Sequence, residues 1–294
     1  MTTTSSATTG RVAPVAPVRL PARGLRHDLR TVSVVWRREM IRFGHDRARA
    51  VSAFVQPLLF LFVLGSGLAS VVRPGGGDVD FRTFLFPGVL ATSVMFTAVF
   101  SGITIVWDRE LGFLREMLVA PVRRGAILTG KCLGGATVAT VQSLLVLALA
   151  GVVGVPYSPS LLVTLMGLLF LTSFALTACG LVIAVRVRQM QAVMPMVQLI
   201  ITPMMFLSGS LFPLTQLPTW LRIAVRINPL TYAVDPMRAA VFEHLDVAPQ
   251  TRRALAPGVT WFGWHVPVGV EVGLVVALGI GLLAVATALF SRDG

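Results

Sequence analysis

The sequence predicts an all-α polytopic membrane protein with six transmembrane helices. Of its 294 residues, 55% are hydrophobic and only 13% are charged, whereas a soluble domain carries about 25% charged residues. No Asp, Glu, Lys or Arg lies between Cys132 and Val185. Apolar runs of about 20 residues are what a bilayer crossing requires, so a water-soluble protein with one large core does not fit this chain.

The N-terminal region divides into two parts. Residues 1–24 are predicted to be a disordered tail, because they begin with a Thr- and Ser-rich stretch without the apolar centre of a signal peptide. Residues 25–49 are predicted to hold an interfacial amphipathic helix. Apolar side chains recur there at three- and four-residue steps from Leu25 to Phe43, and arginines occupy the other faces. The alternative is a solvated arm that happens to be periodic.

The predicted membrane domain covers residues 50–294. Its third and fourth spans share the uncharged stretch, which Gly and Pro residues in Gly151–Pro159 break into a helical hairpin ending at Arg186. The fifth span contains Pro195 and Pro203, so a kink or a partly unwound segment is expected. The remaining boundaries are Ala50–Val72 for the first span, Thr83–Trp107 for the second, Gln191–Phe212 for the fifth and Val266–Phe290 for the sixth.

The long loop before the sixth span is predicted to contain two short helices over residues 213–246. Leu217–Ile227 has an apolar stripe, and Asp235 followed by Pro236 has the residue types of an N-cap and a first helical position. Both segments are too short to span the bilayer. We expect them to be re-entrant or to rest on the outer leaflet.

Basic residues indicate the orientation of the chain. With both termini in the cytoplasm, 18 of the 25 Lys and Arg residues fall in inside segments, as the positive-inside rule requires. Lys131 is the only lysine, and this preference for arginine suggests a bacterial genome rich in GC. The net charge of +12 is thus explained by membrane topology, and no nucleic-acid partner is expected.

One stretch imitates a nucleotide-binding loop. Residues Gly125–Cys132 match G-x-x-x-x-G-K-[ST] except at the last position, where the hydroxyl that would hold Mg²⁺ is missing. No strand precedes the stretch and a membrane span follows it. We therefore expect no bound nucleotide or other cofactor, and we interpret Lys131 as an interfacial residue that extends its ammonium toward water.

A short charged segment connects the second and third spans. Asp108–Leu118 places leucines on one helical face and both signs of charge elsewhere, and Pro121 ends it. Apolar anchors with flanking charges suit docking into a groove of a cytosolic protein. A generic interfacial loop helix is the alternative.

Glu271 is the acidic residue within a predicted span. An ionisable group there is costly and is frequently functional, but its position near one end of the span favours a side chain that stays wet beside an arginine of the preceding loop. No metal-ligand spacing and no catalytic Ser, His or Cys arrangement is recognisable. The chain is not expected to be an enzyme by itself.

Three motifs resemble those of ABC-2-type transporter permeases, in the daunorubicin-resistance and nodulation-factor-export branch. They are Asp108–Pro121, Leu207–Pro213 and Asn228–Tyr232, the last followed by Asp235 and Arg238. Phe86-Pro87-Gly88 also fits, and the resemblance extends in order from about Trp36 to the C-terminus.

The resemblance implies the transmembrane domain of a type V exporter with a separate ATPase. It implies two permease subunits, identical or different, and two copies of a cytosolic ABC ATPase that binds ATP and Mg²⁺. The coupling helix that touches the ATPase would be residues 108–119, with Asp108, Arg109, Glu110, Leu111, Gly112, Phe113, Leu114, Arg115, Glu116 and Met117 as its site residues. The outer gate would comprise Pro203, Ser208, Gly209, Phe212, Pro213, Asn228, Pro229 and Tyr232.

The expected function is therefore ATP-driven export from a bacterial cell across the plasma membrane. The interiors of the predicted spans are rich in Leu, Val, Ala, Met and Phe, which suits a hydrophobic or amphipathic drug, antibiotic or lipid. Multidrug efflux and antibiotic resistance are the corresponding roles. A proton-coupled secondary transporter and a membrane scaffold without transport activity are the alternatives.

Overall fold

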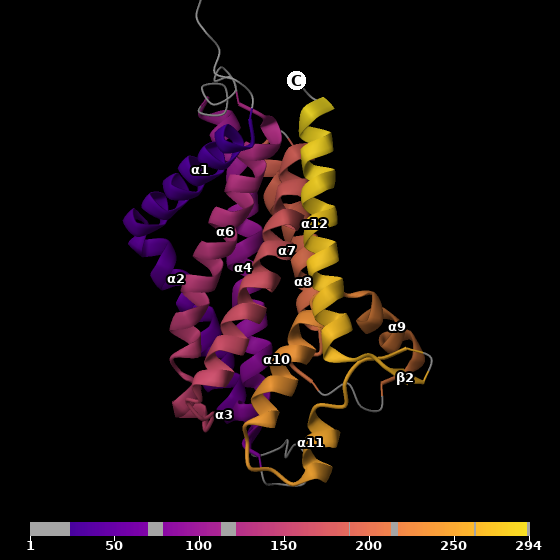
Figure 1. The fold of residues 1–294 in the computed structure, drawn as a ribbon. Coiled ribbons are helices and arrows are strands. Elements are labelled where there is room, and N and C mark those ends of the chain that lie inside the picture. The colour runs from indigo at the N-terminus through magenta and orange to yellow at the C-terminus, as the bar shows by residue number, and fades with distance from the viewer. Residues whose placement is uncertain are drawn as a thin grey trace, which may run out of the picture.

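The computed structural model describes residues 24–69, 79–112, 122–187, 189–212, 217–261 and 263–292, and these residues form a helical bundle (Figure 1). Its helices are α1 (Leu25–His45), α2 (Arg47–Leu58), the π-helical η1 (Leu59–Leu64), α3 (Gly65–Ala69), α4 (Phe81–Glu110), α6 (Arg124–Leu147), the 3₁₀ turn η3 (Ala150–Val153), α7 (Pro159–Arg186), α8 (Met190–Phe206), α9 (Thr219–Ile227), α10 (Thr231–Glu243), α11 (Pro249–Leu255) and α12 (Val268–Arg292). Strands β1 (Thr260–Trp261) and β2 (Trp264–His265) form an antiparallel ribbon. The predicted tail lies outside the described residues.

Four described helices are long and apolar enough to cross a membrane, namely α4, α6, α7 and α12. Two shorter apolar helical stretches, Phe54–Ala69 and Met190–Phe206, occupy the places of the first and fifth predicted spans. The predicted hairpin break is present: η3 is followed by Gly154, whose φ of 78° lies in the left-handed region that glycine adopts without strain. The all-α membrane fold is confirmed, and the helix positions are consistent with six spans.

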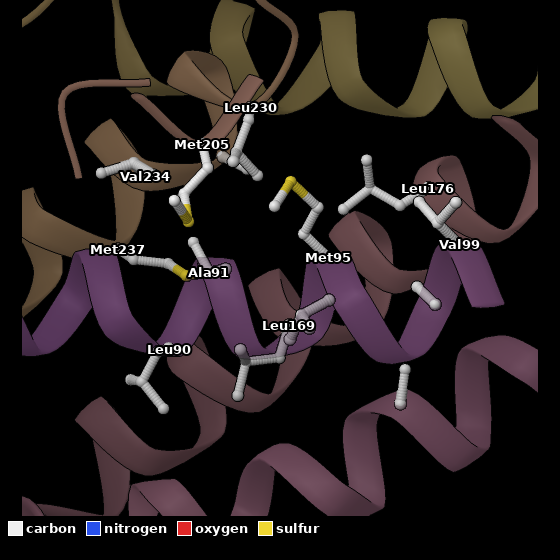
Figure 2. Packing of buried hydrophobic residues seen from close by; sticks show 14 of the residues in the cluster. Leu90, Ala91, Met95, Val99, Leu169, Leu176, Met205, Leu230, Val234 and Met237 are labelled. Carbon is white, nitrogen blue, oxygen red and sulfur yellow. The ribbon is translucent and has the colours of Figure 1, made fainter. Parts of the chain in front are cut away.

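Helix α4 lies at the centre of the bundle. Figure 2 shows its buried apolar side chains meeting those of α7, α8 and α10; the labelled residues are Leu90, Ala91, Met95, Val99, Leu169, Leu176, Met205, Leu230, Val234 and Met237. Helices α4 and α7 approach closely because glycines face each other: a Cβ atom on Gly102 would lie 2.4 Å from the Thr177 carbonyl oxygen. Small residues at such contacts are typical of membrane helix packing.

Helix α1 lies across α6 and buries one of its faces there (Figure 1). A Cβ atom on Gly130 of α6 would lie 2.8 Å from Val35 Cβ, and one on Gly134 would lie 2.8 Å from Glu39 Cβ. The predicted helix over residues 25–43 is therefore present, extended to His45, with one face held against protein.

The two ends of the described chain lie at the same end of the bundle. Arg123, which precedes α6, pairs with Asp28 of α1 at 3.1 Å. Its neighbour Arg124 donates to the Phe290 carbonyl oxygen of α12 at 3.2 Å. The beginning of α1 and the end of α12 are therefore held near the beginning of α6.

The opposite end carries α9, α10, α11 and the ribbon (Figure 1). The expectation that Asp235 caps a helix is wrong, because α10 begins at Thr231 and contains Pro236 in its interior. The turn before α10 is closed instead by Asn228, whose Oδ1 accepts a hydrogen bond from the Leu230 amide at 3.0 Å. Helix α10 is buried against α4, α7 and α12, whereas α9 leaves Trp220, Ile223 and Ile227 exposed.

Candidate functional site

Asp108 forms the centre of a buried ionic cluster in the last turns of α4. Its carboxylate pairs with the Lys131 ammonium of α6, with Arg38 of α1 at 2.8 Å and with Arg42 of α1 at 3.4 Å. Only 2% of Asp108 is exposed. Helix α1 supplies both arginines because residues 38 and 42 are one helical turn apart and lie on one face. One carboxylate thus joins three helices.

Lys131 contributes a second contact to this cluster. Its ammonium lies 3.1 Å from Glu39 Oε1 of α1 and 3.5 Å from Thr104 Oγ1 of α4, and only 2% of the residue is exposed. The expectation that Lys131 extends toward water at the interface is wrong, since two carboxylates inside the bundle satisfy it. The stretch Gly125–Cys132 lies within helix α6, and its Gly130 serves to admit α1.

The five charged side chains of the cluster carry three positive and two negative charges. Burial by itself would lower the pKa of Arg38, but the carboxylates of Asp108 and Glu39 outweigh it and raise this pKa above its ordinary value. Removing one member of a buried ion pair leaves an uncompensated charge, which is strongly destabilising. The cluster therefore fixes α1, α4 and α6 relative to one another.

The predicted coupling segment begins inside α4 and not after it. Asp108, Arg109 and Glu110 belong to the last turn of that helix, and Leu111 and Gly112 follow it. Gly112 has a φ of 82°, so the chain leaves the helix axis there. The Asp108 carboxylate is buried among cations of this chain. Leu111 is 65% exposed, while Phe113, Leu114, Arg115, Glu116 and Met117 lie outside the described residues.

Glu110 connects the same turn to another helix. Its Oε1 accepts a hydrogen bond from the Met190 backbone amide at 2.9 Å, at the first residue of α8. A carboxylate at a helix N-terminus satisfies a free amide and complements the helix dipole. The start of the predicted coupling segment is thus bonded to α1 and α6 through Asp108, and to α8 through Glu110.

A cavity of about 360 Å³ opens beside this turn, between α1, α2, α4 and α8. Its wall is mostly apolar, with Arg42 and Asp46 at one edge. The lining residues are Arg42, Asp46, Gln56, Phe96, Thr97, Phe100, Thr104, Trp107, Met190 and Met194. A ligand with an apolar body and a polar end is the chemical class that such a wall would accept.

The predicted outer-gate residues come together at the other end of the bundle. Helix α8 ends at Phe206, six residues earlier than predicted, and the chain turns at Ser208 and at Gly209, whose φ is 71°. Asn228 Nδ2 donates to the Met204 carbonyl oxygen at 2.7 Å, which joins the end of α8 to the turn before α10. The Pro203 carbonyl oxygen accepts a hydrogen bond from the Leu207 amide at 2.8 Å.

The other outer-gate residues differ in their contacts. Tyr232 donates its hydroxyl proton to the Arg226 carbonyl oxygen at 2.6 Å and accepts a hydrogen bond from Trp261 Nε1 at 2.9 Å. Pro229 and Phe212 are half-buried. Pro213 lies outside the described residues.

Glu271 lies in the first turn of α12 and is fully buried, so the expectation that it stays wet is wrong. Its carboxyl contacts that of Asp235, which α10 brings to the same place. Asp235 Oδ2 also accepts a hydrogen bond from the Val259 backbone amide at 3.2 Å. The physical reason is that α10 folds into the bundle and covers the beginning of α12.

Sequence reasoning missed two groups, the partners of Lys131 and the pair Asp235 and Glu271. The residues of each group lie far apart in the chain, since Glu39 and Lys131 are separated by 92 in residue number, so no local pattern connects them. A usable signal existed nevertheless, because isolated charged residues within apolar segments require buried partners.

The family model described as ABC-2 type transporter matches residues 30–242 of this chain. Nodulation protein J of Rhizobium leguminosarum bv. trifolii is 33% identical over 71% of this chain and 80% of its own length. The putative transport permease ycf38 of Cyanophora paradoxa is 27% identical over 70% of this chain and 72% of its own length. The probable doxorubicin resistance ABC transporter permease protein DrrC of Mycobacterium tuberculosis is 27% identical over 79% of this chain and 84% of its own length.

Proposed function

The chain belongs to the ABC-2 type transporter family as a multi-pass permease subunit that works with a separate ATP-binding subunit, and from this premise we propose that it exports a hydrophobic or amphipathic compound. The compound leaves a bacterial cell across the plasma membrane, and both chain termini face the cytoplasm. The excess of basic residues at the α1 end of the bundle supports this orientation.

The observation that carries the proposal is the bonding of the α4 end to three other helices. Asp108 contacts Lys131 and two arginines of α1, and Glu110 binds the first amide of α8. A displacement of residues 108–119 by an ATPase would be transmitted directly to α1, α6 and α8. ATP and Mg²⁺ would bind to the ATPase, and the permease would carry no cofactor.

The apolar cavity supports the proposed class of substrate. It adjoins the same turn of α4, and Phe96, Phe100 and Met194 supply apolar surface while Arg42 supplies a positive charge at its edge. The name of the Mycobacterium tuberculosis relative associates that protein with doxorubicin, a planar amphipathic drug. Drugs, antibiotics and lipids are therefore the proposed substrates.

The proposed assembly contains two permease subunits and two ATPase subunits. Most of α12 and much of α8 are apolar and exposed, including Leu199, Phe206 and Ile280. Surfaces of this kind suit either lipid or a second permease. Purification of the complex shows whether the second permease is identical to this chain. A complex with one kind of permease subunit contains two copies of this chain, and a complex with two kinds is a heterodimer of permeases.

Transport by reconstituted vesicles tests the function. Inside-out vesicles that contain the permease and its ATPase should accumulate doxorubicin or a fluorescent short-chain phospholipid only when ATP is added. The matched control contains an ATPase with its catalytic carboxylate replaced by an amide. Uptake that follows a proton gradient without any ATPase would overturn the proposal and favour a secondary transporter; no uptake of either probe would overturn the substrate class.

A further inference from the structure

The contact between α10 and α12 contains two buried carboxyl groups. Glu271 is 0% exposed and Asp235 is 4% exposed, and the two side chains lie within hydrogen-bonding reach of each other. Neither buried oxygen of Glu271 has a hydrogen-bond partner among the described residues, since the neighbouring Val259 amide donates to Asp235 Oδ2. If both carboxyls were ionised, the two neighbouring negative charges would repel each other. The buried Glu271 oxygens would then be charged and without a hydrogen-bond donor.

One buried cation lies beside the pair. Arg238 is 1% exposed, donates to the Gly209 carbonyl oxygen at 2.6 Å, and lies 4.6 Å from the centroid of the Phe84 ring. Burial lowers the pKa of Arg238 to about 10, while the neighbouring carboxylate of Asp235 opposes the change, so the guanidinium is positive at neutral pH. It offsets one negative charge and leaves the second uncompensated.

Charged and titratable groups on the neighbouring described elements are few. Arg226 of α9 acts on the Tyr232 hydroxyl, on which Glu271 also acts, whereas Asp235 is the charged group that acts on Glu271 itself. Helix α7 has no charged residue from Pro159 to Val185, and α4 contributes the Phe84 ring. On β2, His265 lies near the same glycine as Asp235: a Cβ atom on Gly258 would lie 3.9 Å from His265 Nδ1 and 3.8 Å from Asp235 Oδ2. The Tyr232 hydroxyl is already engaged with Arg226 and Trp261.

We propose that Asp235 and Glu271 form a proton-binding site that holds one proton between them. Glu271 carries the proton and donates a hydrogen bond to the Asp235 carboxylate, whose remaining charge is balanced by Arg238. The proton removes the repulsion and lets one Glu271 oxygen donate a hydrogen bond to Asp235. Its binding therefore attaches α10 to the beginning of α12.

The site makes the attachment of α10 sensitive to pH. Burial raises the pKa of Asp235, although Arg238, Glu271 and the Val259 amide act in the opposite direction. A carboxyl pair that keeps a proton in the folded state contributes stability at low pH and loses it as the pH rises above the ordinary carboxyl range of about 4. This inference goes beyond the transport function and does not depend on it.

Infrared spectroscopy detects the proton directly. The full-length permease with its ATPase in lipid nanodiscs should show the carbonyl stretch of a protonated carboxyl at about pH 7, where free carboxyls are ionised. Asp108 and Glu39 are buried but are paired with Lys131, so they should not contribute to this band. The band should disappear in Glu271→Gln and persist in Glu243→Gln, a control at the exposed end of α10. Absence of the band in the unmodified protein would overturn the proposal.

The thermal unfolding midpoint provides an independent test. Between about pH 5 and pH 9, the midpoint of the unmodified complex should fall more steeply than that of Glu271→Gln, whose amide donates to Asp235 at every pH. Glu243→Gln should follow the unmodified complex. A Glu271→Gln protein that does not fold, or equal slopes for all three proteins, would contradict the shared proton. If the midpoint depends on added Na⁺ or Ca²⁺ and not on pH, the two carboxyls bind a metal ion and not a proton, and the proposal is overturned.

Discussion

Glu110 at the end of α4 accepts a hydrogen bond from the Met190 amide at the beginning of α8, with 2.9 Å between Oε1 and the nitrogen. Two residues earlier, Asp108 binds α1 and α6. One helical turn therefore contacts three elements of the bundle. A force applied at Leu111 and Gly112 would reach all three elements through this turn.

The first prediction concerns the stability of the buried cluster. Lys131→Met should lower the free energy of unfolding by about 3 kcal/mol, because Asp108 and Glu39 lose the cation that lies fully buried between them. Denaturant unfolding of the purified protein in detergent measures the change. Arg253→Met, at an exposed arginine of α11, is the control and should change stability by less than about 0.5 kcal/mol.

The second prediction concerns coupling between ATP hydrolysis and transport. Asp108→Asn keeps the size of the side chain but removes the charge that holds Arg38 and Arg42. The amount transported per ATP hydrolysed should fall by about tenfold, within the range of ordinary coupling energies. Parallel assays of hydrolysis and transport in vesicles measure the ratio. An unchanged ratio would show that the cluster has only a structural role.

Phe113 and Glu116 lie in the segment that the family resemblance assigns to the ATPase contact. Replacing either by Ala should uncouple ATP hydrolysis from transport while the permease remains in the membrane, because the ATPase would lose an anchor. Membrane content is checked by immunoblotting and coupling by the same vesicle assays. Normal coupling in both variants would count against the docking role.

The fourth prediction concerns the cavity beside α4. Phe100→Ala removes a large apolar side chain from its wall, and the affinity for a hydrophobic substrate should fall by about tenfold or more. The KM of ATP-dependent uptake of doxorubicin measures this effect. Leu199→Ala on α8 is a suitable control, because Leu199 is 74% exposed and does not line the cavity; an equal loss in both variants would exclude a specific site.

The fifth prediction concerns Gly130, which lies in the stretch that resembles a nucleotide-binding loop. Gly130→Ala should destabilise the protein by about 1–3 kcal/mol, because its methyl group would lie 2.8 Å from Val35 Cβ and 2.9 Å from the Val32 carbonyl oxygen. Gly167→Ala on α7 meets no atom within 4 Å and should be neutral or slightly stabilising through helix propensity. Thermal unfolding of both variants distinguishes packing from a general intolerance of alanine.

The sequence was sufficient for features that depend on local composition. Apolar runs and the glycines and prolines near Gly154 predict the helices and the hairpin, and the periodicity from Leu25 to Phe43 predicts α1. The same reasoning failed for Asp235, because Asp followed by Pro is typical of a helix start wherever it occurs, and here α10 begins earlier to continue its packing against α4. A local sequence pattern does not predict the contact between α10 and α4.

Charged residues were the least predictable part of the candidate site. Lys131 at the beginning of a span usually extends to water, and only the position of α1 places Glu39 and Arg38 nearby. Glu271 is similar, since the residue that covers it, Asp235, comes from a separate loop helix. In both cases the environment of the charge is set by a tertiary contact between segments that are distant in the chain.

Helix α8 has consequences for the surrounding bilayer because it is short. Its 17 residues extend about 25 Å, whereas the hydrocarbon core is about 30 Å thick. The 25 residues of α12 extend about 37 Å and exceed that thickness. Helix α8 is therefore shorter than the hydrocarbon core and α12 is longer. The bilayer should thin beside α8, and α12 should tilt. The transport rate should consequently depend on the acyl chain length of the lipid.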